Sequence, residues 1–182
     1  EDCHYFCFHL PFTKMALKAN LALARMSGMA EPDEELVTAR HADSLHYNRV
    51  TGNSYTASLY VGLASLLENV SANLAGRRIG MFSYGSGCMA SFFSGVICED
   101  YRRSLRGDRH REMLRERREL TYEQYLDCYN HRLPTDGRDY KTEHHCTGAF
   151  RLAGIRGHKR IYESNPAAMF AAASGVRHEV AV

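Results

Sequence analysis

Three runs of the sequence predict β-strands, and the first of them has the composition of a short buried strand. Residues 3–8 read CHYFCF, and Pro11 ends this run because proline lacks the N–H that a strand ladder needs. Residues 78–84 and the apolar run 88–98 are the other two, and the turn Gly85-Ser86-Gly87 separates them. Two strands joined by a glycine-rich turn predict a β-hairpin, which we place at the edge of a buried site.

Apolar residues at helical spacing predict three helices between these strands, over residues 13–26, 31–48 and 54–70. Thr13 is expected to cap the first helix, and the acidic stretch 31–35 fits the start of the second. The third helix is mostly apolar, so we expect it to be central and covered on several sides.

The remainder of the chain is more polar. Residues 101–119 contain eight arginines and no lysine, with glutamates interleaved, which predicts a solvated helix or, alternatively, a face for an acidic partner protein. A further helix is predicted from Thr121, a turn-rich loop over 134–139, and short strands over 150–155 and 158–162. The expected organisation is one domain over residues 1–163, with an Arg-rich helical insertion at about 101–133, and an Ala-rich, partly disordered tail over 164–182.

Composition narrows the class of protein. The 182 residues suit one domain, and the net charge of +2 gives no reason to expect nucleic acid or a membrane surface as partner. No apolar run reaches the roughly 18 residues that a membrane span needs. The six cysteines form no CxxC pair, so we expect no metal site but free, buried thiols in a reducing cytoplasm. The absence of a signal-peptide pattern agrees with a cytoplasmic location.

Several segments carry residue types suited to chemistry, although each has an ordinary structural explanation. His9 leaves an apolar strand just before a helix, but a lone histidine there is more often a core residue with satisfied hydrogen bonds. Asn53 precedes a buried helix, where asparagine is usually a cap. The turn at 85–87 lacks the following helix of a dinucleotide-binding motif. Residues 154–162 read GIRGHKRIY, which is typical of a basic hairpin.

Taken together and in this order, the segments resemble the C-terminal half of 3-hydroxy-3-methylglutaryl-CoA synthase and its polyketide-branching relatives. The similarity is carried by residues 8–15 (FHLPFTKM), 53–60 (NSYTASLY) and 74–87 (LAGRRIGMFSYGSG), and it returns near 149–162. The resemblance implies an α/β, thiolase-like layered αβαβα fold, of which this chain would be the second, C-terminal half.

The resemblance also implies a reaction and a site. An acetyl group held on a cysteine as a thioester would attack the β-ketone of an acetoacetyl-type thioester, and water would release the product. By matching position, His9 would be the catalytic histidine, able to donate a hydrogen bond as negative charge develops on oxygen. The matching acyl-pocket residues are Asn53, Tyr55 and Ser86.

Coenzyme A or phosphopantetheine thioesters would be the substrates, with no tightly bound cofactor. Lys14 and Lys18 lie four residues apart, hence on one helix face, and match positions that meet the phosphates. The nucleophilic cysteine and general-base glutamate of the family lie upstream of the matched region. We therefore expect this chain to be inactive alone and to need an N-terminal half, in the same or a separate chain. A homodimer is a further expectation from the resemblance.

Three functional alternatives remain open. We favour a polyketide β-branching synthase acting on acyl carrier proteins, because of residues 155–162 and the Arg-rich stretch at 102–118. The second is a mevalonate-pathway synthase acting on acetyl-CoA and acetoacetyl-CoA. The third is a non-catalytic thiolase-like interaction module, which would have no need of His9, Asn53 and Ser86 together. A ketoacyl synthase also uses histidine and then asparagine, but the match at 83–87 favours the synthase family.

Overall fold

The structure is a computed structural model that describes residues 3–85, 87–143 and 148–166. The chain divides into two compact units, Glu1–Arg118 and Glu119–Val182, and each is described here by itself. Within the described ranges, no helix is long and apolar enough to cross a membrane. The expected tail over 164–182 lies for the most part outside the described residues.

The first unit is built on a three-stranded sheet of β1 (Tyr5–Phe8), β2 (Arg78–Gly85) and β3 (Met89–Val96). The strand order is β1-β2-β3, with β1 parallel to β2 and β2 antiparallel to β3. Parallel strands need a long crossover, and the helices between residues 14 and 69 supply it. All three predicted strands and the hairpin are confirmed.

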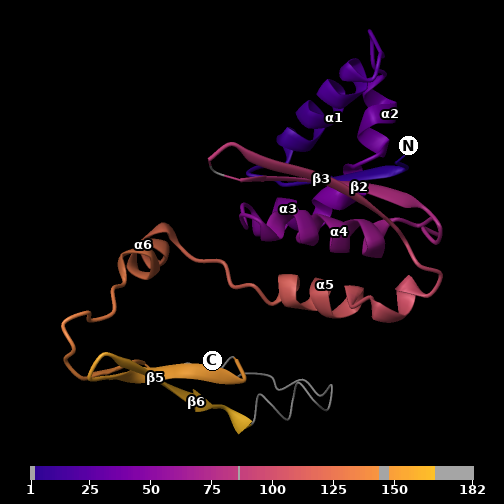
Figure 1. The fold of residues 1–182 in the computed structure, drawn as a ribbon. Helices are drawn as coiled ribbons and strands as arrows, with labels where there is room; N and C mark the ends of the chain where they lie inside the picture. Colours follow the sequence, from indigo (N-terminus) through magenta and orange to yellow (C-terminus); the bar gives the residue numbers. More distant parts are fainter. Residues whose placement is uncertain (1–2, 86, 144–147, 167–182) are drawn as a thin grey trace. The chain divides into compact units, whose positions relative to one another are not determined.

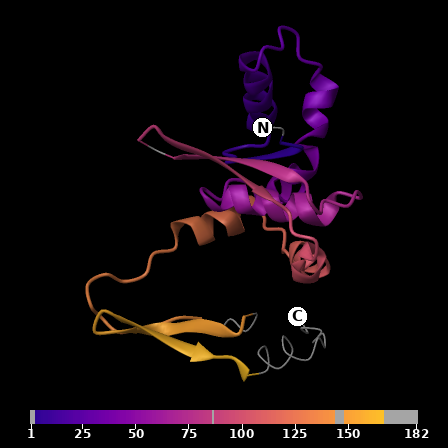
Figure 2. The ribbon, with the colours of Figure 1, turned by 45° about the vertical axis from the view of Figure 1, so that its right-hand side comes forward.

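Helices cover both faces of this sheet (Figures 1 and 2). On one face lie α1 (Lys14–Met26) and α2 (Glu34–Ala39), and on the other lie α3 (His46–Thr51) and α4 (Ala57–Asn69). Thr13 does precede α1, but its side chain makes no capping hydrogen bond. The apolar helix α4 packs against the sheet and α3, while Tyr60 on its outer side is 60% exposed.

The prediction of one helix over residues 31–48 is wrong. The segment forms α2, a 3-10 helix η1 (Ala42–Leu45) and α3. Asp33 is the true N-cap of α2, because its side chain accepts hydrogen bonds from the backbone of Glu35 and Leu36. The chain turns at His41, whose buried ring Nδ1 lies 3.0 Å from the Val37 carbonyl oxygen. Periodicity could not show that this polar ring would be buried at a bend.

Alternation along β1 divides the core between the two faces of the sheet. Phe6 and Phe8 belong to the cluster that includes Ala16 of α1. Cys7, between them, belongs to the cluster that includes Leu59 of α4. This two-residue period is the pattern expected of a strand in a sheet whose two faces are both covered by helices.

The second strand of the hairpin is exposed along its whole length. Every residue of β3 is exposed, including Met89, Phe92 and Phe93. The prediction of buried thiols is also wrong in part. All five cysteines in the described ranges are free, but only Cys3 and Cys7 are buried, and the exposed ones are Cys88, Cys98 and Cys128.

The Arg-rich stretch forms two short helical pieces, the 3-10 helix η2 (Tyr101–Ser104) and α5 (Gly107–Arg115). The predicted single helix is interrupted at Leu105, whose backbone is extended. Only Tyr101 of these two pieces is fully buried, where it joins the α4 side of the core.

The second unit contains α6 (Tyr122–Asn130) and a sheet of β4 (Tyr140–Lys141), β5 (Phe150–Arg156) and β6 (Lys159–Ser164). Thr121 and Gln124 form a capping box at the start of α6, which confirms the predicted helix start. The sheet is antiparallel in the order β4-β5-β6.

Candidate functional site

His9 lies immediately after β1, at the point where that strand meets β2. Its backbone N–H donates to the Phe82 carbonyl oxygen at 2.8 Å, and its ring lies edge-on to Tyr84 with centroids 6.3 Å apart. The ring Nδ1 is buried and has no hydrogen-bond partner within the described ranges. A core histidine normally satisfies both ring nitrogens, so this imidazole retains unused hydrogen-bonding capacity.

Asn53 lies in the short connection between α3 and α4. Gly52, just before it, has φ +74°, a left-handed backbone conformation that glycine adopts readily. The Oδ1 of Asn53 accepts a hydrogen bond of 2.9 Å from the backbone N–H of Tyr55. This local bond fixes the amide and leaves its Nδ2 hydrogens available as donors. Asn53 is therefore not the cap of α4, whose N-cap position is Thr56.

One buried hydrogen bond joins the histidine segment to the asparagine segment. The backbone N–H of Leu10 donates to Ser58 Oγ at 2.9 Å, and both residues are almost fully buried. Ser58 lies in the first turn of α4, and its carbonyl oxygen accepts from Asn48 Nδ2 at 3.1 Å. Residues 48 positions apart in the sequence are thus fixed against each other beside His9 and Asn53.

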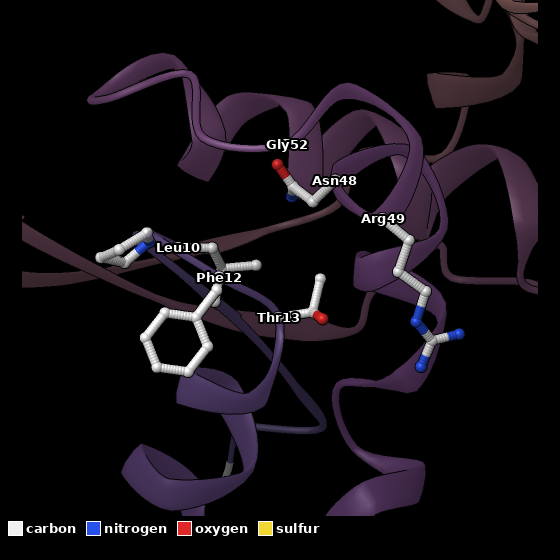
Figure 3. A pocket seen from close by; sticks show the side chains of 7 residues that line it. Leu10, Phe12, Thr13, Asn48, Arg49 and Gly52 are labelled. Atoms are coloured by element: carbon white, nitrogen blue, oxygen red, sulfur yellow. The ribbon is translucent and has the colours of Figure 1, made fainter. Parts of the chain in front are cut away.

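A cavity of 180 Å³ lies between the same two segments (Figure 3). Its lining residues come from the chain after β1 and from α3 with its end: Leu10, Pro11, Phe12, Thr13, Asn48, Arg49 and Gly52. Asn48 is 3% exposed, and its Oδ1 has no partner within the described part of the chain. The exposed guanidinium of Arg49 adds a positive charge at the same cavity.

Lys14 and Lys18 are exposed on the first turns of α1. They are four residues apart and therefore on one side of the helix, as expected from the sequence. The N-terminus of a helix carries a partial positive charge, which these two ammonium groups reinforce. This end of α1 suits an anionic group such as a phosphate.

The remaining predicted site residues stand as follows. Tyr55 is 77% exposed and has φ +53°, which is unusual for a residue with a side chain. Ser86 lies outside the described residues, although Tyr84, two positions earlier, contacts His9. Residues 154–162 belong to the other unit, where they form parts of β5 and β6.

Sequence reasoning missed Ser58, Asn48 and Arg49. A serine among the apolar residues 57–70 is a detectable signal, because a hydroxyl in a buried helix needs a partner. Nothing in the sequence marked Asn48 and Arg49 as site residues. They lie at and just after the end of the single helix predicted over residues 31–48, which the structure divides into α2, η1 and α3.

Cys7 and Glu68 are two of the titratable groups in this unit whose pKa values are shifted. Burial raises the pKa of Cys7 to about 12, so this thiol is no nucleophile at neutral pH. Burial by itself raises the pKa of Glu68, but hydrogen bonds from Tyr47, His110 and the Arg106 backbone outweigh it and hold the pKa below its ordinary value. Glu68 is therefore an ionised carboxylate inside the protein.

Comparison with known proteins identifies the family of this chain. The family model described as hydroxymethylglutaryl-coenzyme A synthase C terminal matches residues 26–147. A hydroxymethylglutaryl-CoA synthase of Enterococcus faecalis is 43% identical over 135 residues, which cover 74% of this chain and 35% of that enzyme.

Solved structures agree with the sequence relatives. An HMG-CoA synthase complexed with CoA has a TM-score of 0.75 and 34% identity, over 89% of this chain and 42% of that one. The HMG synthase of the curacin biosynthetic pathway, in complex with acetyl donor-ACP, has a TM-score of 0.76 and 28% identity, over 90% of this chain and 43% of that one. The present chain thus spans less than half the length of these proteins, and it has the C-terminal part of their thiolase-like fold.

Proposed function

Because this chain belongs to the hydroxymethylglutaryl-CoA synthase family, we propose that it is the C-terminal part of an acyltransferase that condenses an acetyl unit with an acetoacetyl-type thioester. The observation that carries the proposal is the hydrogen bond from Leu10 to Ser58 beside the cavity. It fixes the segments of His9 and Asn53 against each other, as a shared acyl site requires.

In the proposed reaction, the methyl carbon of a cysteine-bound acetyl thioester loses a proton and forms a C–C bond with the β-ketone carbon of the acceptor. The ketone oxygen gains negative charge and then a proton, and water cleaves the cysteine thioester to release the product. His9 donates a hydrogen bond to the oxygen that becomes charged, a contribution of about 10²–10³ in rate for one oriented donor. Asn53 holds the acceptor through Nδ2, since its Oδ1 is already bonded to Tyr55.

The acceptor pocket in this proposal also includes Tyr55 and Ser86, and Lys14 with Lys18 bind the phosphates of coenzyme A or phosphopantetheine. Both are substrates, and no tightly bound cofactor takes part. The complementary N-terminal half, in the same or a separate chain, supplies the nucleophilic cysteine and the general-base glutamate. The 182 residues alone are therefore proposed to be inactive, and the assembled enzyme to be a cytoplasmic homodimer.

Among the two enzyme classes we propose the polyketide β-branching type, whose acyl groups arrive on acyl carrier proteins. The support is the surface of residues 102–118, where arginines such as Arg103 and Arg109 are exposed and would attract an acidic carrier. A structural relative has been solved with acetyl donor-ACP. The alternative is the mevalonate-pathway reaction with acetyl-CoA and acetoacetyl-CoA, which the similarity to the Enterococcus faecalis enzyme favours.

Acylation of the full-length enzyme distinguishes these two classes. Purified enzyme is mixed with acetyl-CoA or with acetyl-carrier protein, and the mass of the active-site peptide is followed in time. Faster acylation by the carrier protein supports the β-branching proposal, while preferential acylation by acetyl-CoA overturns it in favour of the mevalonate reaction.

A second experiment tests the site and the non-catalytic alternative. His9→Ala and Asn53→Ala should each lower kcat for condensation by about 10²-fold or more, the scale of one oriented donor. Lys14→Gln with Lys18→Gln should raise KM and leave kcat nearly unchanged, because phosphate binding is made equally in ground and transition states. If the complete enzyme shows no condensation with either donor, the chain is an interaction module.

A further inference from the structure

The Arg-rich stretch is linked to α3 at two points, and the first link runs through the buried carboxylate of Glu68 in the last turn of α4. The Glu68 side chain is 3% exposed and accepts a hydrogen bond of 2.6 Å from the Tyr47 hydroxyl of α3. The Nδ1 of His110 in α5 lies 3.0 Å from both carboxylate oxygens. An ionised carboxylate only accepts, so Nδ1 carries a hydrogen and donates it. The Arg106 backbone N–H donates to the same group at 3.1 Å.

The second contact is at the other end of α3. The guanidinium of Arg117 donates a hydrogen bond to the carbonyl oxygen of Val50. The last carbonyl groups of a helix lack hydrogen-bond partners within it and carry partial negative charge. A guanidinium there is favourable because it donates a hydrogen bond and because its charge is opposite. Val50 is three residues before Asn53 in the sequence.

The two contacts stabilise a helix that would not be stable by itself. With six residues, α3 is too short to be stable in isolation, and its orientation depends on its tertiary contacts. Its end continues through Gly52 into Asn53, so any rotation of α3 moves the amide. The same helix presents Asn48 and Arg49 to the 180 Å³ cavity.

We propose that His110 and Arg117 are positioning residues for Asn53. His110 acts through Glu68 and Tyr47 on the first turn of α3, and Arg117 acts directly on its last turn. This inference rests on the proposed function, because it takes Asn53 to be the residue that holds the acceptor. Part of the Arg-rich stretch then sets the geometry of the active site, independently of any binding of a carrier protein.

The test is steady-state kinetics of the full-length enzyme with CoA substrates, so that carrier binding plays no part. Arg117→Met and His110→Leu remove the two contacts, while Arg117→Lys and His110→Gln keep a donor in each place. Arg25→Met is the matched control, an exposed arginine at the far end of α1 from Lys14. Acylation of the nucleophilic cysteine by acetyl-CoA is measured separately for every variant.

Arg117→Met and His110→Leu should each lower kcat for condensation by about 10-fold or more, because small displacements of a reacting group are costly. KM and the acylation step should change little, the Lys and Gln variants should recover most of the activity, and Arg25→Met should match the wild type. A general loss of structure would instead lower the rates of acylation and condensation together.

A double-mutant cycle with Asn53→Ala decides the mechanism. If Arg117 acts through Asn53, Arg117→Met lowers kcat much less in the Asn53→Ala enzyme than in the wild type. Equal losses in both backgrounds overturn the inference, as does an Arg117→Met enzyme with wild-type kcat. If Asn53→Ala itself has no effect, the proposed role of Asn53 fails instead. Should His110→Leu not fold, Arg117 alone carries the test, since its side chain is exposed.

Discussion

The backbone N–H of Leu10 donates a 2.9 Å hydrogen bond to the Oγ of Ser58, and this bond joins the two segments that carry His9 and Asn53. Backbone amides are usually paired within helices or sheets, but Leu10 lies two residues past the end of β1. A helix side chain therefore completes the hydrogen bonding of the loop, and the geometry of the site depends on it.

Ser58→Ala removes this bond and leaves the buried Leu10 N–H without a partner. We expect a loss of about 1–3 kcal/mol in the free energy of unfolding, together with a lower kcat because the histidine segment is freed. Urea denaturation of the full-length protein measures the first effect. Ser91→Ala, on the exposed strand β3, is the control and should change neither quantity. Wild-type stability of the Ser58→Ala protein would show that this hydrogen bond contributes nothing to the free energy of unfolding.

Gly80→Ala tests the packing of the sheet. Gly80 is opposite Phe6 in the β1–β2 register, and a Cβ at Gly80 would lie 2.7 Å from the Phe6 ring. That ring is buried against the Arg40 guanidinium at 4.9 Å from its centroid, so it has little room to move. We expect a loss of about 1–3 kcal/mol from overpacking. Urea denaturation measures this loss, and Gly95→Ala, where a Cβ meets nothing within 4 Å, should be tolerated in the same experiment.

The depressed pKa of Glu68 predicts a specific dependence of stability on pH. The ionised form is favoured in the folded state, so its contribution is present above the unfolded pKa, about 4.5, and is lost as pH falls through the lower folded value. Glu68→Gln should therefore be less stable than wild type at pH 7, by about 1–3 kcal/mol. The difference should shrink in acid below pH 4.5. Denaturation curves at several pH values measure it, with the exposed Glu31→Gln as control. A difference that stays constant with pH would contradict the assignment.

Cys7 should resist alkylation. It is fully buried and its pKa of about 12 leaves almost no thiolate at pH 8. Iodoacetamide treatment followed by peptide mass spectrometry should leave Cys7 unmodified in the folded protein, while the exposed Cys128 reacts. Both should react after unfolding in guanidinium chloride. Rapid labelling of Cys7 in the folded protein would show that β1 opens readily.

Strong local signals were sufficient to predict most elements of the first unit. The hairpin at β2–β3 and the helix α4 follow from apolar runs bounded by glycine and asparagine. The bend at His41 did not follow, because its buried ring lies against Asn20, which is 21 residues earlier in the sequence and which only the tertiary fold brings close. In the site, His9 and Asn53 carried a recognisable local pattern. The contacts that Ser58 and Arg117 make with their segments join residues that are tens of positions apart in the sequence. Such contacts produce no periodic pattern from which they could be predicted.

The exposed strand β3 also affects how this polypeptide behaves in solution. It is an edge of its sheet, with one side paired to β2, and Phe92, Phe93 and Val96 are each more than 40% exposed. An apolar strand with unpaired backbone groups is a template for strand addition by another chain. In preparations of these 182 residues, β3 is therefore a site for misassembly between chains. A charged residue at the exposed Met89 is the rational means of keeping such preparations monodisperse.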